Sequence, residues 1–519
     1  MPKPWIPALL LAAVAAAADK PFTPPFETGA EPAPRGRIDE LVFARLTSLS
    51  IQPAHPCSDE VFLRRAYLDV IGTLPTLQEA SQFLADTSPN KRAALVDRLL
   101  ERPEFADYWA MKWSDLLRVK SEFPINLWPN AVQAYYRWIR TSIAKNTPYD
   151  RFVREMLTSS GSNFREAPVN FYRALQSKEP RSIAQAVALT FMGTRAESWP
   201  AARLEGMAGF FSRIGYKSTG EWKEEIVYFD PAKPAQTAVF PDGKPARLAP
   251  DQDPREVFAN WLLAPDNPWF ARAIANRVWY WLLGRGIVHE PDDIRPDNPP
   301  ANPELLAYLE KELVVSHYDI KHIFKLVLTS ETYGLSAIPR SERPEAAANF
   351  AYYPLRRLDA ETLIDAICQI TGTAEQYSSP IPEPFTFLPE DQRSIALPDG
   401  SIGSAFLEMF GRPARDTGLE SERNNRASAE QRLHLLNSTH IQAKIQQSLA
   451  LRALLQAQPG GKPRDPIDRI YLAILSRYPT DAELKVVAAY FQSAQGNRWP
   501  AAVDLAWSLI NGAEFQYRH

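Results

Sequence analysis

The stretch 254–336 constrains the fold more than any other part of the chain, because it holds repeated signals for helix starts and stops. Asn267-Pro268 predicts a helix start, since asparagine accepts a hydrogen bond from a free backbone amide and proline has no amide to leave unpaired. Apolar residues then recur at helical spacing, and Gly284 and Gly286 are predicted to end the helix with positive φ angles. The stretch therefore predicts helices that pack through apolar stripes.

Two more helices are predicted in the same stretch, one beginning at Asn302-Pro303 and one near Asp319. The loop before Asn302 combines several prolines with oxygen-bearing side chains. Hard cations such as calcium take carboxylate and amide oxygens from a single loop, although the spacing here is not that of an EF-hand. The candidate calcium ligands are Asp292, Asp293, Asp297 and Asn298.

A structural role for this acidic loop is the alternative that we favour. Aspartate and asparagine often cap turns. Their carboxylates can also pair with Arg277, Arg285 or Arg295, which would hold the loop closed.

A second candidate site lies in the segment GRPARDTGLESER. Its Glu420 and Glu422 can act as acid and base beside Arg423, because paired carboxylates perform that chemistry in hydrolases. Nothing in the sequence brings these residues to a substrate, so we favour structural ion pairs here as well.

Several longer words of the sequence resemble a family of exported, planctomycete-type proteins of unknown function. ANRVW, LLGRGIV and PDDIRPDNPPANPELL are similar to the C-terminal domain of that family. FLRRAYLDVIGTLPTLQEASQFL, PYDRFVREML and AQAVALTFMG are similar to its N-terminal domain, which is named as a planctomycete cytochrome c-like domain. The resemblance covers nearly the whole mature chain and implies a two-domain protein without an assigned activity.

The haem motif that this resemblance implies is missing. In the family, the words similar to AQAVALTFMG are followed by Cys-x-x-Cys-His, the attachment motif of c-type haem, whereas this chain continues TRAESWPAARLEGMAGFF from Thr194. The family's cysteine before its Glu-x-Glu-Arg word is replaced here by Leu419. We therefore expect no covalent haem and no cofactor other than the candidate calcium. If those residues form one centre in relatives, this chain has lost the centre as a unit.

The chain is predicted to be mainly α, with two helical domains joined by a proline-rich connector that holds a small β-hairpin. In the connector, EEIVYF and QTAVF are the expected strands. The predicted parts are a signal peptide at 1–18, a proline-rich spacer at 19–37, an N-terminal cytochrome c-like family domain at 38–215, the connector at 216–253 and a C-terminal family domain at 254–519.

Residues 1–18 predict the location of the protein. They have the basic start, the apolar run and the Ala-x-Ala end of a secretory signal peptide. The apolar run is shorter than the roughly 20 residues that a membrane-spanning helix needs. We therefore expect an exported protein, in the periplasm or outside the cell, with no membrane span after signal cleavage.

A helix-start motif occurs near both ends of the chain. Thr76 with Glu79 predicts a capping box, and Thr480 with Glu483 repeats it at the same spacing. The repeat is either a common local device that arose twice or a duplicated helical hairpin whose copies pack near each other.

The segment 108–152 is rich in tryptophan, tyrosine and arginine. Sugar rings stack on such aromatic side chains, but core packing is the interpretation that we favour, since aromatics carry the largest apolar area. The two cysteines, Cys57 and Cys368, form either one long-range disulfide or two buried thiols.

Charge and motifs narrow the functional classes. The formal charge of −3 and the lack of a basic run give no electrostatic basis for binding nucleic acid. The sequence also lacks the patterns of serine hydrolases, zincins and phosphate-binding loops. We expect a binding or assembly role at the periplasm or cell surface, with a protein or polysaccharide partner in the cell envelope. An enzyme acting on polysaccharide is the alternative, and a redox role is the third, which the missing haem motif opposes.

Overall fold

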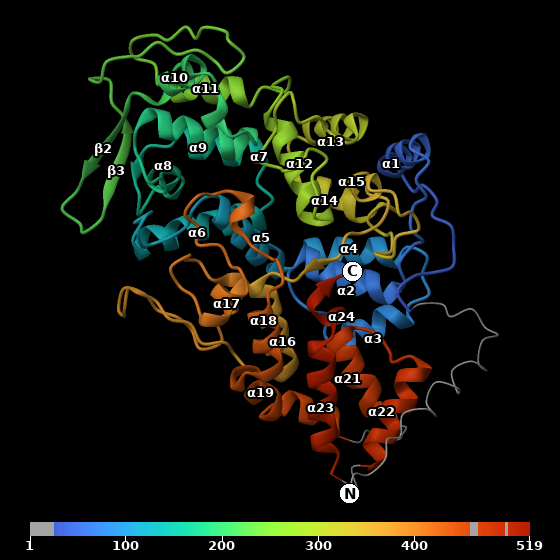
Figure 1. Ribbon diagram of the computed structural model, residues 1–519. Coiled ribbons are helices and arrows are strands. Elements are labelled where there is room, and N and C mark those ends of the chain that lie inside the picture. The colour runs from blue at the N-terminus through green and yellow to red at the C-terminus, as the bar shows by residue number, and fades with distance from the viewer. Residues whose placement is uncertain (1–24, 457–464, 494–496) are drawn as a thin grey trace, which may run out of the picture.

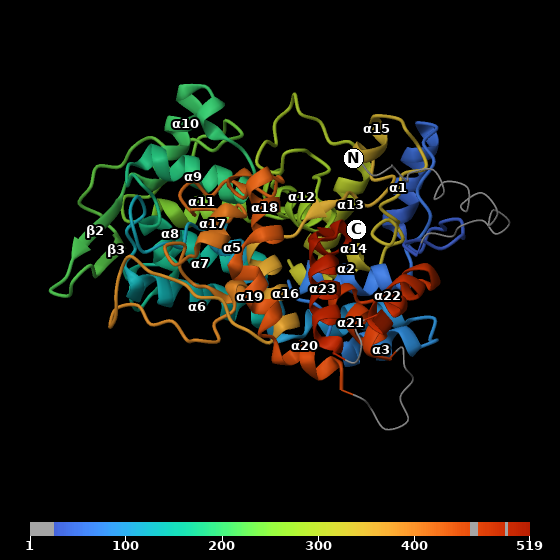
Figure 2. The same ribbon diagram turned by 60° about the horizontal axis from the view of Figure 1, so that its bottom comes forward.

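The computed structural model describes residues 25–456, 465–493 and 497–519, so the predicted signal peptide lies outside the described residues. The fold is mainly α with two small antiparallel sheets, which confirms the predicted class. Figure 1 places the strands β2 and β3 at one end of the molecule and the C-terminal helices α21 to α23 at the other, and Figure 2 shows the same order from a second direction.

The part of the chain before the connector is built from short helices with recognisable local starts. Ser58 accepts a hydrogen bond from the Val61 amide at the start of α2, and Thr76 and Glu79 form the predicted capping box at the start of α3. The helices are α1 (Arg37–Ser48), α2 (Asp59–Val70), α3 (Leu77–Ala85), α4 (Lys91–Leu100), α5 (Pro103–Leu116), α6 (Pro129–Ala144), α7 (Tyr149–Thr158), α8 (Asn170–Arg173), α9 (Pro180–Met192) and α10 (Ala201–Ala208).

The hairpin is present, but one of its strands differs from the prediction. Strand β3 (Glu225–Phe229) pairs antiparallel with β2 (Ile214–Ser218) and, on its other edge, with β1 (Gly161–Ser162). The QTAVF segment does not join this sheet, and its Val239 forms an isolated bridge to Pro245. β3 pairs with β2 and not with QTAVF because only residues 219–224 separate β2 from β3, so a short turn joins the two strands.

The second part of the chain begins with the predicted helical block. Its further helices are α11 (Pro254–Leu262), α12 (Phe270–Leu283), α13 (Pro303–Val315), α14 (Ile320–Leu328), α15 (Glu345–Ala348), α16 (Ala360–Thr371), α17 (Ala405–Met409), α18 (Ala429–Asn437), α19 (Thr439–Gln446), α20 (Leu449–Leu454), α21 (Asp465–Leu475), α22 (Asp481–Ser493), α23 (Arg498–Asn511) and α24 (Ala513–Gln516). Two short strands, β4 (Arg356–Arg357) and β5 (Tyr517–Arg518), form the second sheet.

Most of the predicted starts and stops of the block are confirmed. Asn302 accepts a hydrogen bond of 3.0 Å from the Leu305 amide, and Asp319 caps α14 in the same way. Gly284 ends α12 with a φ of 69°. The positive φ predicted for Gly286 is wrong, because its backbone is not left-handed and a side chain there would instead meet the Val288 carbonyl at 2.2 Å.

Two apolar cores hold the molecule together, and the larger one crosses the connector. It joins α1, α2 and α4 to α7 with α9 and α11 to α14, so both predicted domains contribute to it. The smaller core gathers α16 to α21 and α23 with parts of α2. The larger core is therefore continuous across the connector, and the predicted domain bounds stay a prediction.

The two helical hairpins that carry the capping boxes contact each other. Thr480 and Glu483 exchange hydrogen bonds as Thr76 and Glu79 do, and α21, which precedes the second box, packs on α3, which follows the first. Figure 1 shows α21 beside α2 and α3. Both cysteines are described and both are free, buried thiols, Cys57 in the larger core and Cys368 in the smaller, which excludes the disulfide alternative in this structure. Among the described residues, none of the helices has the length and hydrophobicity that a bilayer-spanning segment requires.

Candidate functional site

A polar cavity of about 800 Å³ lies between the two halves of the chain. We name it the interdomain pocket. Concave sites of this size with convergent polar groups are where small ligands usually bind. Its charged and aromatic lining residues are Tyr108, Trp109, Lys112, Tyr280, Trp281, Arg356, Arg357, Asp359, Glu420, Glu422, Arg423, Arg426, Tyr517 and Arg518.

The pairing of β4 with β5 builds one wall of the interdomain pocket. Arg356 lies directly opposite Arg518 in this register, so two like charges face each other across the strands. Such a pair is destabilising unless an anion lies between the two cations. Asp69 of α2 supplies that anion, with its Oδ1 at 3.3 Å from Arg356 Nη2 and 3.0 Å from Arg518 Nε. A residue of the N-terminal half thus fixes the cationic wall.

Asp359 occupies the N-cap position of α16, but its side chain does not cap the helix. Its carboxylate faces the interdomain pocket. It accepts from Lys112 Nζ at 2.9 Å, from the Tyr108 hydroxyl at 3.1 Å, from Arg518 Nη2 at 3.1 Å and from Asn425 Nδ2 at 2.7 Å. The residue therefore organises the pocket rather than the helix start.

Asp359 and Lys112, which pair at this wall, both have shifted pKa values. Burial by itself raises the pKa of Asp359, but the cations Lys112, Arg518 and Arg423 together hold it well below its ordinary value. Burial lowers the pKa of Lys112, and Arg423 lowers it further while Asp359 opposes the change. The cationic surroundings therefore favour the ionised form of Asp359, whereas burial and Arg423 disfavour the charged form of Lys112.

Glu420 is a carboxylic acid of the interdomain pocket whose pKa is raised. Its Oε1 accepts a hydrogen bond of 3.1 Å from the Trp281 indole, while its buried Oε2 has no hydrogen-bond partner among the described residues. Burial raises the pKa of Glu420 to about 7, and the nearby Asp292 carboxylate adds to the effect while Arg277 and Lys112 oppose it. A carboxylic acid with this pKa exchanges a proton near neutral pH.

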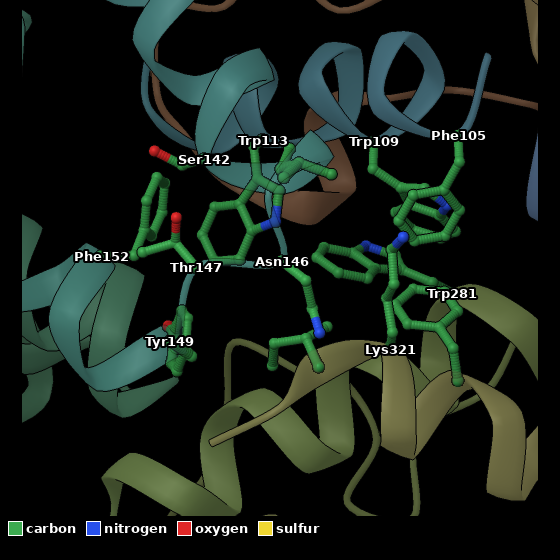
Figure 3. A pocket seen from close by; sticks show the side chains of 13 residues that line it. Phe105, Trp109, Trp113, Ser142, Asn146, Thr147, Tyr149, Phe152, Trp281 and Lys321 are labelled. Carbon is green, nitrogen blue, oxygen red and sulfur yellow. The ribbon is translucent and has the colours of Figure 1, made fainter. Parts of the chain in front are cut away.

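An aromatic cluster supports the wall that carries Glu420. Figure 3 shows Trp109 and Trp113 reaching down from α5 and Trp281 reaching up from α12 to meet them. The ring centroids of Trp109 and Trp281 are 5.0 Å apart, and those of Trp113 and Trp281 are 5.8 Å apart. The gap that the cluster encloses is about 40 Å³, room for about one water molecule. The aromatic-rich segment 108–152 is thus mainly core, as the favoured interpretation predicts.

Arg423 anchors the segment that carries Glu420. Its guanidinium contacts Glu361 Oε2 at 2.6 Å and Asp115 Oδ2 at 2.6 Å, and Asp115 also pairs with the fully buried Arg415. Surrounding carboxylates raise the pKa of Arg423 although burial lowers it. The predicted site residue Arg423 is therefore a structural cation at the edge of the interdomain pocket.

Comparison with protein-family models finds two matches. Residues 37–199 match PSCyt2, a protein of unknown function (DUF1549), and residues 254–491 match PSD1, a protein of unknown function (DUF1553). The two matched domains follow one another in the order that the sequence resemblance implies. A search of curated proteins and a search of solved structures each find no match. The resemblance seen in the sequence is confirmed, and the matched domains carry no assigned activity.

In the PSD1 domain, the acidic loop is held largely by its own arginines. Asp292 and Arg277 are both buried, with their charged atoms 2.5 Å apart, and Asp292 Oδ2 also accepts the Glu420 amide at 2.7 Å. Arg295 pairs with Asp293 at 3.2 Å and with Asp297 at 3.5 Å.

The four candidate calcium ligands are therefore engaged by arginines or by backbone groups of the protein. Asn298 donates its amide to the His289 and Asp293 carbonyls, which closes the turn. Within the described ranges, no group of three or more histidine, cysteine, aspartate or glutamate side chains is arranged to hold a metal ion. The favoured structural interpretation matches this geometry, and calcium binding stays a prediction.

The Glu422 carboxylate accepts hydrogen bonds from a turn of its own segment. It accepts from the backbone amides of Asp416 and Thr417 at 2.9 and 3.1 Å and from the Thr417 hydroxyl at 2.7 Å. These bonds close the turn before Glu420. Both glutamates line the interdomain pocket, and the acid–base role of the pair stays a prediction.

The position where the sequence resemblance implies a haem motif lies beside the acidic loop. The Ile294 amide donates to the Gly193 carbonyl at 2.8 Å, and the Thr194 hydroxyl donates to the Ile294 carbonyl at 3.0 Å. The Glu420 amide, next to Leu419, contacts the same loop through Asp292. These neighbours are consistent with one lost centre, which stays a hypothesis.

Sequence reasoning missed most of the cationic and tyrosine residues of the interdomain pocket. Lys112 and Tyr108 come from the PSCyt2 half, whereas Asp359 and Arg518 follow much later in the chain. The adjacent arginines of LRRLDAE, just before a strong helix start, are the one local signal that marked part of this wall.

Proposed function

We propose that the protein is a binding protein of the cell envelope and that the interdomain pocket takes an oxyanion group of its ligand, such as a carboxylate or a sulfate. The sequence supports export through the predicted signal peptide. The lining of the pocket supports an anion, because its cations outnumber its carboxylates. The cations are Lys112, Arg356, Arg357, Arg423, Arg426 and Arg518, and the carboxylates are Asp359, Glu420 and Glu422.

One observation carries the proposal. Most of these cations are engaged by carboxylates, but Arg357 and Arg426 keep donors to spare. Within the described residues, the exposed Arg426 forms hydrogen bonds through its backbone groups alone, and the buried Nη2 of Arg357 has no hydrogen-bond partner. The two residues are in contact in the folded protein, since Arg357 Nη1 donates to the Arg426 carbonyl at 3.3 Å. An oxyanion such as a carboxylate or a sulfate is the group that two such guanidinium groups bind best.

The test is anion binding by the purified mature protein. Trigalacturonate, a sulfated disaccharide and citrate serve as probes, measured by titration calorimetry at two ionic strengths. We expect at least one of them to bind, and Arg426→Gln to weaken it about tenfold, since a charge-assisted hydrogen bond is worth about 1.5–3 kcal/mol.

Arg432→Gln is the matched control, because Arg432 is exposed on α18 and does not line the interdomain pocket. Arg357→Lys tests the second cation while keeping its charge. Binding that is unchanged in Arg426→Gln, or no binding of any probe at about 10 mM, a concentration that detects even weak complexes, refutes the proposal.

A second candidate function is an enzyme on an extracellular polysaccharide, and Glu420 is the observation that favours it. Glu420 lines a pocket, has a pKa of about 7 and has one buried oxygen without a hydrogen-bond partner among the described residues, and these properties suit a general acid–base group. Glu420→Gln should then abolish release of reducing ends from polygalacturonate or alginate near neutral pH while probe binding persists. Equal reducing-end release by the wild-type protein and by Glu420→Gln would exclude this role.

A further inference from the structure

We infer that the protein has a second binding site, for a neutral oligosaccharide, in a cavity of about 670 Å³ between the segment 194–203, the start of α12 and the loop 293–300. We name it the tryptophan pocket. It shares no lining residue with the interdomain pocket among those that the structure describes. The inference is therefore independent of the proposed anion site.

Two tryptophans give the tryptophan pocket its apolar surface. Trp199 and Trp269 line it, and both are only half-buried. The guanidinium of Arg203 lies 4.0 Å from the Trp199 ring centroid and 5.9 Å from that of Trp269, and Arg203 Nε donates to the Pro241 carbonyl at 2.9 Å. Trp261 contacts Trp269 from a further side, at 5.6 Å between centroids. The two rings are thus fixed while part of each remains accessible, and such surfaces accept the C–H faces of sugar rings.

The polar groups around these rings carry little net charge. Arg195 pairs with Glu290 at 2.9 Å, Arg272 with Glu310 at 2.7 Å, and Arg295 with Asp293 at 3.2 Å. Arg203 is the remaining arginine of the lining and has no carboxylate partner within the described residues. A ligand that presents many hydroxyl groups and no net charge suits this lining, since the ion pairs offer hydrogen bonds without excess charge.

The walls of the tryptophan pocket are pre-formed. Five prolines line it and restrict the backbone around it. The loop is tied to the segment 194–203 and its neighbour Gly193 by the bonds from Ile294 and Thr194, and is closed internally by Asn298. A rigid site loses little conformational entropy when a ligand binds, which raises affinity for a flexible oligosaccharide. The prolines are Pro200, Pro268, Pro296, Pro299 and Pro300.

The experiment titrates four neutral probes into the mature protein: cellohexaose, xylohexaose, chitohexaose and maltohexaose. Titration calorimetry and tryptophan fluorescence are read in parallel. We expect one of the four to bind and Trp199→Ala to weaken it about tenfold or more. Asp297→Ala is the second variant, because its side chain is 74% exposed and its removal leaves the fold intact. It should weaken binding by a smaller factor.

Two controls test whether the oligosaccharide binds in the tryptophan pocket rather than elsewhere on the protein. Trp222→Ala removes a tryptophan that is 70% exposed and lines neither pocket, so it should leave oligosaccharide binding unchanged. Arg426→Gln should affect the anion probes and not the neutral ones. No binding of any neutral probe at about 10 mM, equal loss in Trp222→Ala, or full binding by both Trp199→Ala and Asp297→Ala overturns the inference.

Discussion

The free energy of unfolding of Glu420→Gln, compared with that of the wild type, should rise as the pH increases. The glutamine keeps the oxygen that accepts the Trp281 indole hydrogen bond. It removes a carboxyl whose pKa burial raises from an ordinary 4.5 to about 7. Because the folded state binds this proton more tightly than the unfolded chain, the wild-type protein loses stability as pH rises from about 4.5 to about 7. The glutamine variant does not share this loss.

The size of the effect follows from the two pKa values. Each tenfold change in proton affinity is worth about 1.4 kcal/mol, so full ionisation of Glu420 costs roughly 3 kcal/mol of the free energy of unfolding. At pH 5 the unfolded chain is already largely ionised here, and the cost is about 1 kcal/mol. The advantage of Glu420→Gln should thus grow by about 2 kcal/mol between pH 5 and pH 8.5, with water in the pocket reducing the figure.

Urea unfolding at pH 5, 7 and 8.5, followed by far-ultraviolet circular dichroism, measures this difference. Glu345→Gln is a suitable control, because it removes an exposed carboxylate on α15 and should change the free energy of unfolding by less than about 0.5 kcal/mol at each pH. A Glu420→Gln advantage that stays constant with pH, or that falls as pH rises, would refute the reasoning about the buried acid.

Three further substitutions test the polar framework by urea or thermal unfolding. Asp359→Ala should lower the free energy of unfolding by about 3–5 kcal/mol, since it leaves buried cations unpaired. In the wild type, the stabilisation from the depressed pKa of Asp359 should be complete above about pH 4 and lost at lower pH, which an acid titration of the melting temperature checks. Arg277→Met should cost a similar 3–5 kcal/mol because it strands the buried Asp292, and the double variant with Asp292→Leu should recover much of it. Gly284→Ala should destabilise by more than about 1 kcal/mol, given a φ of 69° and a Cβ that would lie 2.2 Å from Arg356 Cδ. Melting temperatures equal to that of the wild type would contradict each of these.

The helical architecture was readable from the sequence wherever its cause is local. A capping box such as Thr76 with Glu79 joins residues three apart, so the same few side chains that predict it also form it. The same holds for Asn302 and Asp319 at the starts of α13 and α14. Glu420 was also found as a candidate residue, because an unusual cluster of charges marks its segment.

The interdomain pocket could not be predicted from local sequence patterns, because its residues come together only in the tertiary structure. Lys112 and Asp359 are separated by 247 residues, and Arg356 meets Arg518 only because β4 pairs with β5. No local pattern encodes such pairs. The packing of the two apolar cores sets them, and the resulting burial then gives Glu420 its raised pKa.

The sequence by itself determined the helical class, several of the locally capped helix starts and the resemblance to the two matched domains. The tertiary structure alone decided which polar groups find partners, which is why Glu422 accepts hydrogen bonds from a turn while Glu420, two residues away, keeps one buried oxygen without a partner among the described residues. The physical reason is that proton affinity and ion pairing depend on distance and on burial in three dimensions, and a linear sequence specifies neither until the chain has folded.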